Sequence, residues 1–238
     1  MIRALRAAPR LAPTGVALAG ALALPAVSPA RAQATAAPPP AAAPPAADGP
    51  QLFDQRKFAE ARAVFSAAVK ANPRDAQALT YMGRLAFNDS SYDVAAGWFE
   101  KAAAIDTRNP QLLYWLGRAY GRDARKANVF RAPGLAKKAR DHLIRALEID
   151  PRHAEAREGL VIFYRDAPGF VGGSMEKAFA TLEPLKEVAP IRYALNLGDL
   201  YAHEKKWAEA EAAYRAGLAA PGDKTALEAR LAGLAGKK

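Results

Sequence analysis

A short pattern recurs along this chain at a regular interval and constrains its fold more than any other feature. Residues 116–120 read Leu-Gly-Arg-Ala-Tyr and residues 82–86 read Met-Gly-Arg-Leu-Ala, so Gly83 and Gly117 are 34 positions apart. A related stretch, Leu-Gly-Asp-Leu-Tyr, stands at 197–201. A period of about 34 residues accommodates two helices with their turns, and such units stack because each alone would leave an apolar face in water. The sequence therefore predicts an all-α solenoid of helix pairs.

The second helix of each predicted pair has its own pattern: a small residue, a large apolar residue four positions later, and a small or apolar residue three positions after that. Positions i, i+4 and i+7 share one helical face, so the small residues let a neighbouring helix approach while the large one fills the gap. A proline follows most of these sets and is expected to end the pair. Five sets can be aligned: Ala61, Phe65 and Ala68 before Pro73; Ala95, Phe99 and Ala102; Ala139, Leu143 and Ala146 before Pro151; Ala178, Leu182 and Leu185 before Pro190; and Ala210, Tyr214 and Gly217 before Pro221.

From about residue 48 to residue 221 the chain resembles the tetratricopeptide repeat family. The resemblance implies a right-handed superhelical solenoid of antiparallel helix pairs with about five units. After Pro221, Asp223 can cap a further helix that carries Leu227, Leu231 and Leu234 on one side and closes the stack. In the fourth unit Val161 replaces the glycine of the other units, which predicts less close packing between the two helices of that unit.

The N-terminus has the pattern of a secretory signal peptide. Arg3, Arg6 and Arg10 precede an apolar run over 15–27, and no acidic residue occurs before Asp48. The run is too short and too rich in Ala and Gly to span ~30 Å of hydrocarbon, which takes ~20 apolar residues. The alanines at 30, 32 and 34 fit a cleavage site of the Ala-x-Ala kind, so residues 1–34 are predicted to be the signal peptide. An uncleaved anchor and an organellar transit peptide are the alternatives.

Residues 35–50 are rich in Ala and Pro and are predicted to form a disordered linker, which leaves 51–238 as the repeat domain. A cleaved leader implies a periplasmic or secreted protein, without an integral membrane span after cleavage. The formal charge is +10, but four of the basic residues belong to the leader, so the excess on the remaining chain is modest. We therefore expect no nucleic-acid partner, which would require clustered Lys and Arg with stacking aromatic residues.

The sequence offers little for catalysis. It has no cysteine, which excludes a thiolate nucleophile or thiolate metal site, and its histidines, His142, His153 and His203, match no metal-binding spacing. All three are expected on solvated or half-buried helix faces. We therefore predict no enzyme activity, no catalytic or metal-ligating residue and no cofactor.

A glycine-rich loop at 168–177 supplies the alternative function, a small-ligand or anion binder that uses Gly172 and Gly173. It is not a Walker loop, because Ser174 follows the glycines directly and both flanks are predicted helices. Ser174 is instead predicted to cap the next helix, and the backbone amides of the loop could hold an anion. The Pro-Gly-x-x-Gly-Gly-Ser loop resembles one found in exported bacterial tetratricopeptide proteins.

Two units are longer than the period. Tyr120 to Ala139 spans ten residues more than the pattern needs, and Tyr164 to Ala178 spans five more. Insertions in solenoids map to turns on one face and often carry binding specificity. The alternative is a lengthened helix pair without a partner.

The family register implies which first-helix residues face the inner surface, where related domains bind peptides. The Lys/Asn pattern that clamps a C-terminal carboxylate in some relatives is not matched. A basic, aromatic surface nonetheless predicts a protein or peptide partner with an acidic segment, because Arg can meet a carboxylate with two donors. A plain solvated helix face is the alternative. The predicted binding residues are Arg84, Phe87, Asn88, Tyr114, Arg118 and Arg122. The same register places Thr80, Gln111, Glu155, Glu158, Ile162, Arg165, Arg192, Leu195, Asp199 and His203 on this surface.

Overall fold

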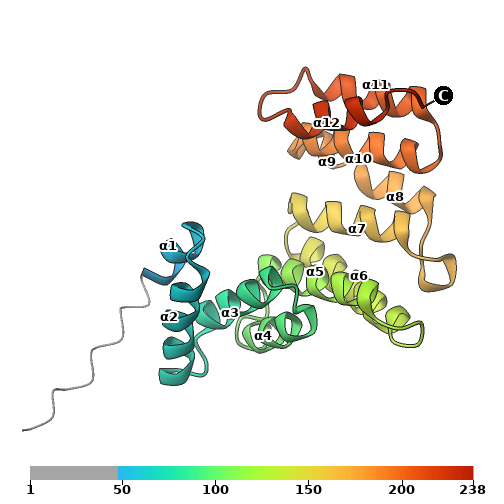
Figure 1. Cartoon of the computed structure of the whole chain (residues 1–238). Helices are drawn as coiled ribbons and strands as arrows, with labels where there is room; N and C mark the ends of the chain where they lie inside the picture. Colours follow the sequence, from blue (N-terminus) through green and yellow to red (C-terminus); the bar gives the residue numbers. More distant parts are fainter. Residues whose placement is uncertain (1–47, 238) are drawn as a thin grey trace, which may run out of the picture. The chain divides into compact units, whose positions relative to one another are not determined.

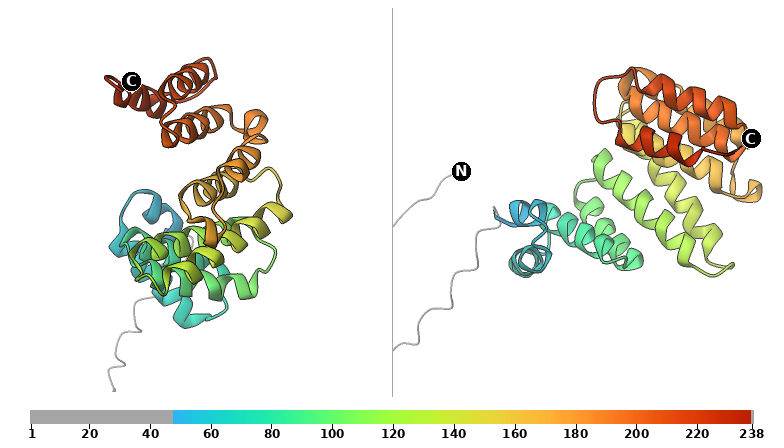
Figure 2. Two further views of the ribbon diagram at one scale, coloured as in Figure 1. Left: turned by 90° about the vertical axis from the view of Figure 1, so that its right-hand side faces the viewer. Right: turned by 45° about the horizontal axis from the view of Figure 1, so that its top comes forward.

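The computed structural model describes residues 48–237, which are helical and contain no strand (Figure 1). The first three pairs are α1 with α2, α3 with α4 and α5 with α6 (Figure 2). Of the later elements, α7 packs against α8, and α10 packs against α8, α9, α11 and α12. The elements are α1 (Asp48–Asp54), α2 (Phe58–Ala71), α3 (Ala76–Asn88), α4 (Tyr92–Ile105), α5 (Pro110–Lys126), α6 (Ala132–Ile149), α7 (Ala154–Asp166), η1 (Gly169–Val171), α8 (Met175–Leu182), α9 (Leu185–Val188), α10 (Pro190–His203), α11 (Trp207–Gly217) and α12 (Thr225–Gly233).

Successive helices pack pairwise, which confirms the predicted all-α solenoid. Each large residue of the second-helix pattern is buried, including Phe65, Phe99, Leu143 and Tyr214. The closing helix is also present: α12 packs against α10 and α11, and its Leu227 is fully buried. The apolar core therefore runs through the described residues as a series of clusters, each shared between neighbouring helices.

The repeated glycines lie where the two helices of one unit touch, as predicted. A Cβ atom at Gly83 would lie 2.5 Å from the Phe99 ring, and one at Gly117 would lie 2.7 Å from Cγ of Leu143. A Cβ at Gly198 would collide with the Tyr214 ring. The absence of a side chain on the first helix is thus matched by a large side chain on the second.

The fourth unit departs from this scheme. Val161 is fully buried in one cluster with Ala178 and Leu182, so this unit packs through a larger side chain and not through a glycine contact. Its second helix is not continuous, contrary to the pattern, but is divided into α8 and α9 around Pro184. Proline has no N–H to donate within a helix and its ring clashes with the preceding turn. The pair ends at Val188, and Pro190 follows it as the first residue of α10.

Polar side chains fix where several helices begin. The Asp75 carboxylate accepts a hydrogen bond from the Ala78 amide at 2.9 Å, and Ser174 Oγ accepts one from the Lys177 amide at 3.2 Å, as predicted for Ser174. His153 has the same role at α7: its Nδ1 accepts from the Ala156 amide at 3.3 Å. The prediction that all three histidines lie on solvated or half-buried faces is therefore wrong for His153, which is 7% exposed.

The predicted domain boundary needs a small correction, because α1 already begins at Asp48 and residues 48–50 are not linker. The predicted signal peptide, 1–34, and the rest of the predicted linker lie outside the described residues. Within 48–237, every helix is too short or too polar to cross a bilayer.

The first insertion lengthens two helices, and the second forms a loop. The first extends α5 to 17 residues and α6 to 18, with a connection at 127–131 between them. The second forms the loop that contains η1 between α7 and α8. Arg140 of α6 donates from Nη1 to the Val171 carbonyl at 3.5 Å, so the second loop lies against the helix that the first insertion extends.

Candidate binding surface

Four of the six predicted site residues form one stacked group of arginine and aromatic side chains. The guanidinium carbon of Arg118 lies 4.8 Å from the Phe87 ring centroid and 5.1 Å from the Trp115 centroid. Trp115 also joins Arg84 of α3 to the group, because the guanidinium carbon of Arg84 lies 5.5 Å from the Trp115 ring centroid. Such contacts orient a guanidinium group while leaving its N–H donors free to meet an anion.

Arg84 lies closer to its aromatic rings than Arg118 does. Its guanidinium carbon lies 4.3 Å from the centroid of Phe53 in α1 and 4.9 Å from that of Tyr81. Its Nε is buried and makes no hydrogen bond within the described part of the chain. A buried donor without an acceptor costs about 1–3 kcal/mol, so the aromatic contacts must offset that cost.

Tyr114 joins the group through its hydroxyl, which accepts a hydrogen bond from Arg118 Nη1 at 3.3 Å. Burial raises the pKa of Tyr114 above its ordinary value, so the hydroxyl stays protonated and can itself donate to a ligand. The Tyr114 ring lies 5.6 Å from the His153 ring. Because His153 Nδ1 accepts from the α7 backbone, its proton lies on Nε2, which donates to Gln111 Oε1 at 3.0 Å.

The other two predicted residues lie at the margin of this group. Arg122 lies one turn beyond Arg118 on α5, and Asn88 is exposed at the end of α3. Within residues 48–237, no carboxylate lies within ion-pair distance of Arg84, Arg118 or Arg122. The stacked group is therefore cationic as well as aromatic.

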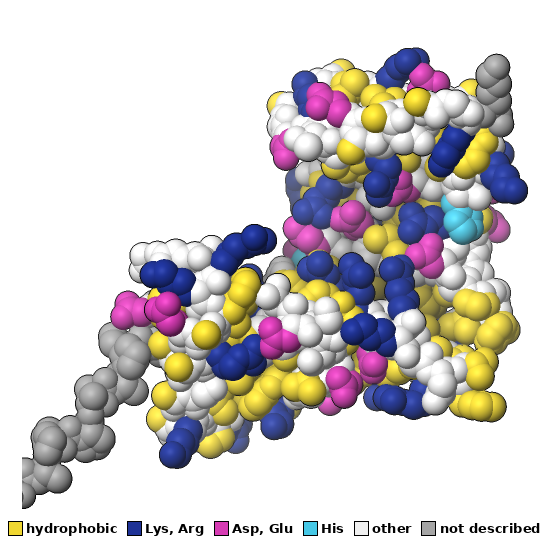
Figure 3. Space-filling model, viewed as in Figure 1, with side chains coloured by type: hydrophobic (Ala, Val, Ile, Leu, Met, Phe, Trp, Pro, Cys, Tyr) yellow, Lys and Arg dark blue, Asp and Glu magenta, His cyan; other side chains and the backbone are white. Residues whose placement is uncertain are grey.

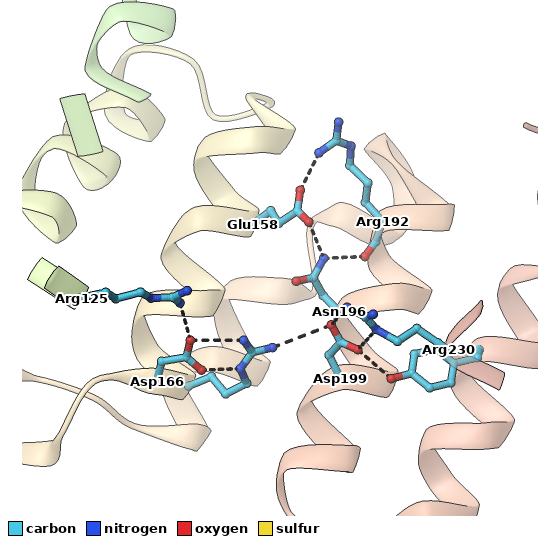
Figure 4. Close-up of polar contacts among 9 residues, drawn as sticks. Arg125, Glu158, Asp166, Arg192, Asn196, Asp199 and Arg230 are labelled. Atoms are coloured by element: carbon cyan, nitrogen blue, oxygen red, sulfur yellow. Dashed lines mark hydrogen bonds and ion pairs between the residues drawn. The ribbon is translucent and has the colours of Figure 1, made fainter. Parts of the chain in front are cut away.

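The equivalent surface on α7 and α10 is different, because its charges are paired (Figure 4). Arg192 of α10 donates to Glu158 at 2.5 Å and to Glu155 at 3.2 Å, both on α7. Asn196 is buried and donates to Glu158 at 3.4 Å. The acidic side chains of α7 are therefore neutralised from the next unit.

A second part of this network is centred on Asp199, which links three helices (Figure 4). Its carboxylate accepts a hydrogen bond from the Tyr214 hydroxyl at 2.7 Å and from Arg230 Nε of α12 at 2.7 Å. Arg165 of α7 lies 3.9 Å from the same carboxylate and also pairs with Asp166 at 2.7 Å. Asp166 is in turn bonded to Arg125 of α5 at 2.8 Å.

A groove of about 840 Å³ lies among α5, α6, α7 and the η1 loop. Its cationic end contains Arg118 and Arg122, and Glu155, Glu158 and Arg192 line the facing wall. Tyr114 and Trp115 connect it to the stacked arginines. In Figure 3, Lys and Arg side chains gather over the region of α5, and hydrophobic side chains gather on the side where the η1 loop lies.

Comparison with known proteins identifies the fold in which this surface lies. Residues 48–110 match the model of the tetratricopeptide repeat family. A thermophilic TPR protein of Thermus thermophilus superposes with a TM-score of 0.66 at 24% identity, covering 80% of this chain and 97% of that one. The chain has the tetratricopeptide-repeat fold. A search of curated proteins found no significant match to the sequence.

Two further solved structures share the TPR fold with this chain. YrrB, described as a TPR protein with an unusual peptide-binding site, has a TM-score of 0.53 at 22% identity, with 76% of this chain and 88% of that one covered. PilW, described as a widely conserved type IV pilus biogenesis factor, has a TM-score of 0.60 at 16% identity, with 79% and 83% covered. At these identities the likeness concerns the fold alone.

Within the TPR fold, the structure brings Arg84, Phe87, Tyr114 and Arg118 together, and it adds ring partners that sequence reasoning missed. Phe53, Tyr81 and Trp115 stack on the arginines from α1, α3 and α5. The accumulation of aromatic residues near the repeated Gly-Arg pair was the available signal. Periodicity alone assigns such rings to the core, so their contact with the guanidinium groups was not predicted.

The glycine-rich loop at 168–177 turns the chain, and the amides of Gly172, Gly173 and Ser174 are hydrogen-bonded within the protein. Gly172 has a φ of +114°, and its amide donates to Gly169 at 2.9 Å. The amides of Gly173 and Ser174 donate to Pro168 at 3.2 Å and Tyr164 at 2.8 Å. A Cβ at Gly173 would collide with the Ala167 carbonyl. These three amides are therefore already paired, and the loop geometry gives the predicted anion-binding alternative no support.

The described residues also contain no group of three or more His, Cys, Asp or Glu side chains placed to hold a metal ion. His142 lies on α6 with its ring stacked at 5.7 Å on that of Tyr120, and burial lowers its pKa below the ordinary value of 6.5. His203 is exposed at the end of α10. The three histidines thus lie on separate elements.

Proposed function

We propose that this protein is a non-catalytic scaffold of the bacterial cell envelope that binds an acidic segment of a partner protein. The binding surface consists of Arg84, Phe87, Asn88, Tyr114, Arg118 and Arg122. The TPR fold supports an interaction role in general, since a stack of helix pairs presents an extended surface. The signal peptide predicted at 1–34 motivates the periplasmic location, and sequencing the N-terminus of the protein isolated from its host tests it.

One observation carries the proposal: three arginines on adjacent helices lack a carboxylate partner among residues 48–237, and two of them are held over aromatic rings. On α7 and α10 the same surface contains arginines that are paired. Equivalent helices in neighbouring units lie about 10 Å apart, which a few residues of extended peptide at ~3.3 Å each can bridge. One acidic segment can therefore reach both Arg84 and Arg118.

The aromatic rings are expected to contribute much of the affinity. An exposed ion pair contributes only about 0–1 kcal/mol, so carboxylate contacts alone would give weak binding. Side chains of the ligand can pack on Phe87 and Tyr114, which are partly buried and pack against the core. Added salt should weaken the binding through the charged contacts.

Peptide selection tests the proposal while the partner is unidentified. We would select a phage-displayed library of random dodecapeptides on the full chain and measure the affinity of the enriched peptides by fluorescence polarisation. We expect enrichment of Asp and Glu, and a loss of at least about tenfold in affinity for Arg118→Glu, equivalent to about 1.4 kcal/mol. Arg145→Glu is the matched control, since Arg145 is exposed on α6 and does not line the groove. Equal affinity of Arg118→Glu and wild type would reject the proposed surface.

A further inference from the structure

The groove beside Arg118 and Arg122 has a second end that the two insertions build. On α5 and α6 this end is lined by small side chains, Gly121 and Ala124 of α5 and Ala132 and Ala136 of α6. Since α7 has 13 residues against 17 and 18 for α5 and α6, the extended hairpin is longer than the helix that follows it. These small side chains leave this end of the groove open. The other residues that line it indicate which kind of ligand side chain could bind there.

Large apolar side chains that are exposed to solvent also line this end of the groove. Val129, in the connection between α5 and α6, is 76% exposed, and Phe170, in η1, is 79% exposed; both line the groove. Phe130, next to Val129, is 92% exposed. Val94, which is 50% exposed, is the other exposed large hydrophobic residue in the described part of the chain, and it lies elsewhere, on α4. Exposed apolar residues grouped around a hollow mark a binding site more often than scattered ones do.

The charges at the opposite end limit what can bind. Arg118 and Arg122 lack carboxylate partners within residues 48–237, whereas Arg125, closer to the apolar end, is bonded to Asp166. Val129 follows the end of α5 at Lys126, and the α5 axis advances about 12 Å from Arg118 and about 6 Å from Arg122 to that end, at ~1.5 Å per residue. Glu155 and Glu158 on the facing wall are bonded to Arg192, so the unpaired charge at this end is cationic. The other end is apolar, and about three residues of extended chain at ~3.3 Å each separate the two ends.

We propose that this groove binds a bulky apolar anchor residue of the partner segment, located about three residues from the carboxylate that meets Arg118 and Arg122. This proposal rests on the proposed function and specifies the ligand further. The anchor packs between Phe170 and Val129 over the small residues of α5 and α6. A protein segment fits better than a lipid surface, because Val129 and Phe170 line a hollow and the cation pair lies within the same hollow.

The same peptide selection tests the anchor with different variants. Enriched peptides are expected to combine an aromatic, Leu or Ile residue with an Asp or Glu about three positions away. Phe170→Ser removes an exposed wall of the groove, and Ala136→Trp fills the hollow. Each should weaken the selected peptide at least about tenfold, as expected for loss of a buried anchor contact. Val94→Ser, an exposed hydrophobic residue outside the groove, should change the affinity less than about twofold.

The outcomes separate this inference from the proposed function. If Arg118→Glu weakens the peptide while Phe170→Ser and Ala136→Trp do not, the acidic-segment proposal stands and the anchor is rejected. If none of these variants weakens binding, or no peptide is enriched, both proposals are rejected. Circular dichroism melting shows whether Ala136→Trp is folded, and Phe170→Ser keeps the test decisive if it is not. If vesicles of phosphatidylglycerol bind wild type but not Phe170→Ser, while peptide affinity is equal, a membrane surface replaces the protein anchor.

Discussion

Arg118 in α5 and Asp199 in α10 occupy equivalent places, each directly after the glycine that packs against the second helix of its unit. Arg118 is stacked on rings and has no carboxylate within ion-pair distance in the described chain. Asp199 accepts hydrogen bonds from Tyr214 and Arg230 and lies near Arg165. At the same position of the repeat, Arg118 therefore has a charge that is available to a ligand, whereas the charge of Asp199 links α10 to three other helices.

The difference shows how a repeat divides its surface between binding and stability. A carboxylate that is already bonded to several donors gains little from a ligand, and a ligand that displaced them would have to replace those contacts. A guanidinium group held over aromatic rings keeps its donors available and loses little conformational freedom on binding. We infer that α3 and α5 provide the binding surface, whereas α7, α10 and α12 use their charges to hold neighbouring units together.

The largest loss of stability is expected at Gly117, the glycine directly before Arg118. Gly117→Leu should lower the free energy of unfolding by about 3 kcal/mol, because its Cβ would lie 2.7 Å from Leu143 Cγ and 3.0 Å from the Ala139 carbonyl oxygen. Urea unfolding followed by circular dichroism measures it. Gly121→Ala is the control: its Cβ would lie 3.8 Å from that of Ala139, and alanine favours a helix by up to about 1 kcal/mol. Unfolding of Gly117→Leu at the wild-type urea concentration would contradict the packing.

A smaller loss of stability is expected when the charged side chain of Asp199 or Arg118 is removed. Asp199→Ala should lower the free energy of unfolding by about 2 kcal/mol, since the hydroxyl of the buried Tyr214 loses its acceptor. Arg118→Ala, at the equivalent position, should cost less than about 1 kcal/mol, the size of a partly exposed cation–π contact. Equal losses in the two variants would remove the distinction between the two surfaces.

A double variant identifies the source of the Asp199 effect. In the Asp199→Ala background, Tyr214→Phe removes the hydroxyl that would otherwise be buried without a partner, so it should recover part of the lost stability. The ring itself must stay, because it fills the space opposite Gly198. If Tyr214→Phe destabilises that background further, the hydrogen bond is not the cause.

The smallest change in stability is expected at Arg84. Arg84→Met should leave the free energy of unfolding within about 1 kcal/mol of wild type, because the lost stacking is offset by removal of a buried Nε that has no partner within residues 48–237. The same variant should weaken an acidic peptide in fluorescence polarisation. A loss of stability as large as that of Asp199→Ala would show that Arg84 serves the fold and not the binding of a ligand.

Much of the fold followed from local sequence. The 34-residue spacing of Gly83 and Gly117, the i, i+4, i+7 sets and the cap at Ser174 are all properties of a single helix or helix pair. Helix periodicity decides which residues share a face, and that is sufficient to predict the buried face and the glycine contacts. The same reasoning correctly located the last helix, whose Leu227 is buried.

Contacts between units were decided only by the tertiary structure. Arg125 and Asp166 are 41 residues apart, and His153 reaches Gln111 across 42, so neither pair has a local signal. His153 was missed as a cap because histidine is not a usual capping residue, although Pro151-Arg152-His153-Ala154 repeats the frame of Pro73-Arg74-Asp75-Ala76. Whether an arginine stacks on a ring or pairs with a carboxylate depends on how neighbouring helices are placed, which a repeat pattern does not specify.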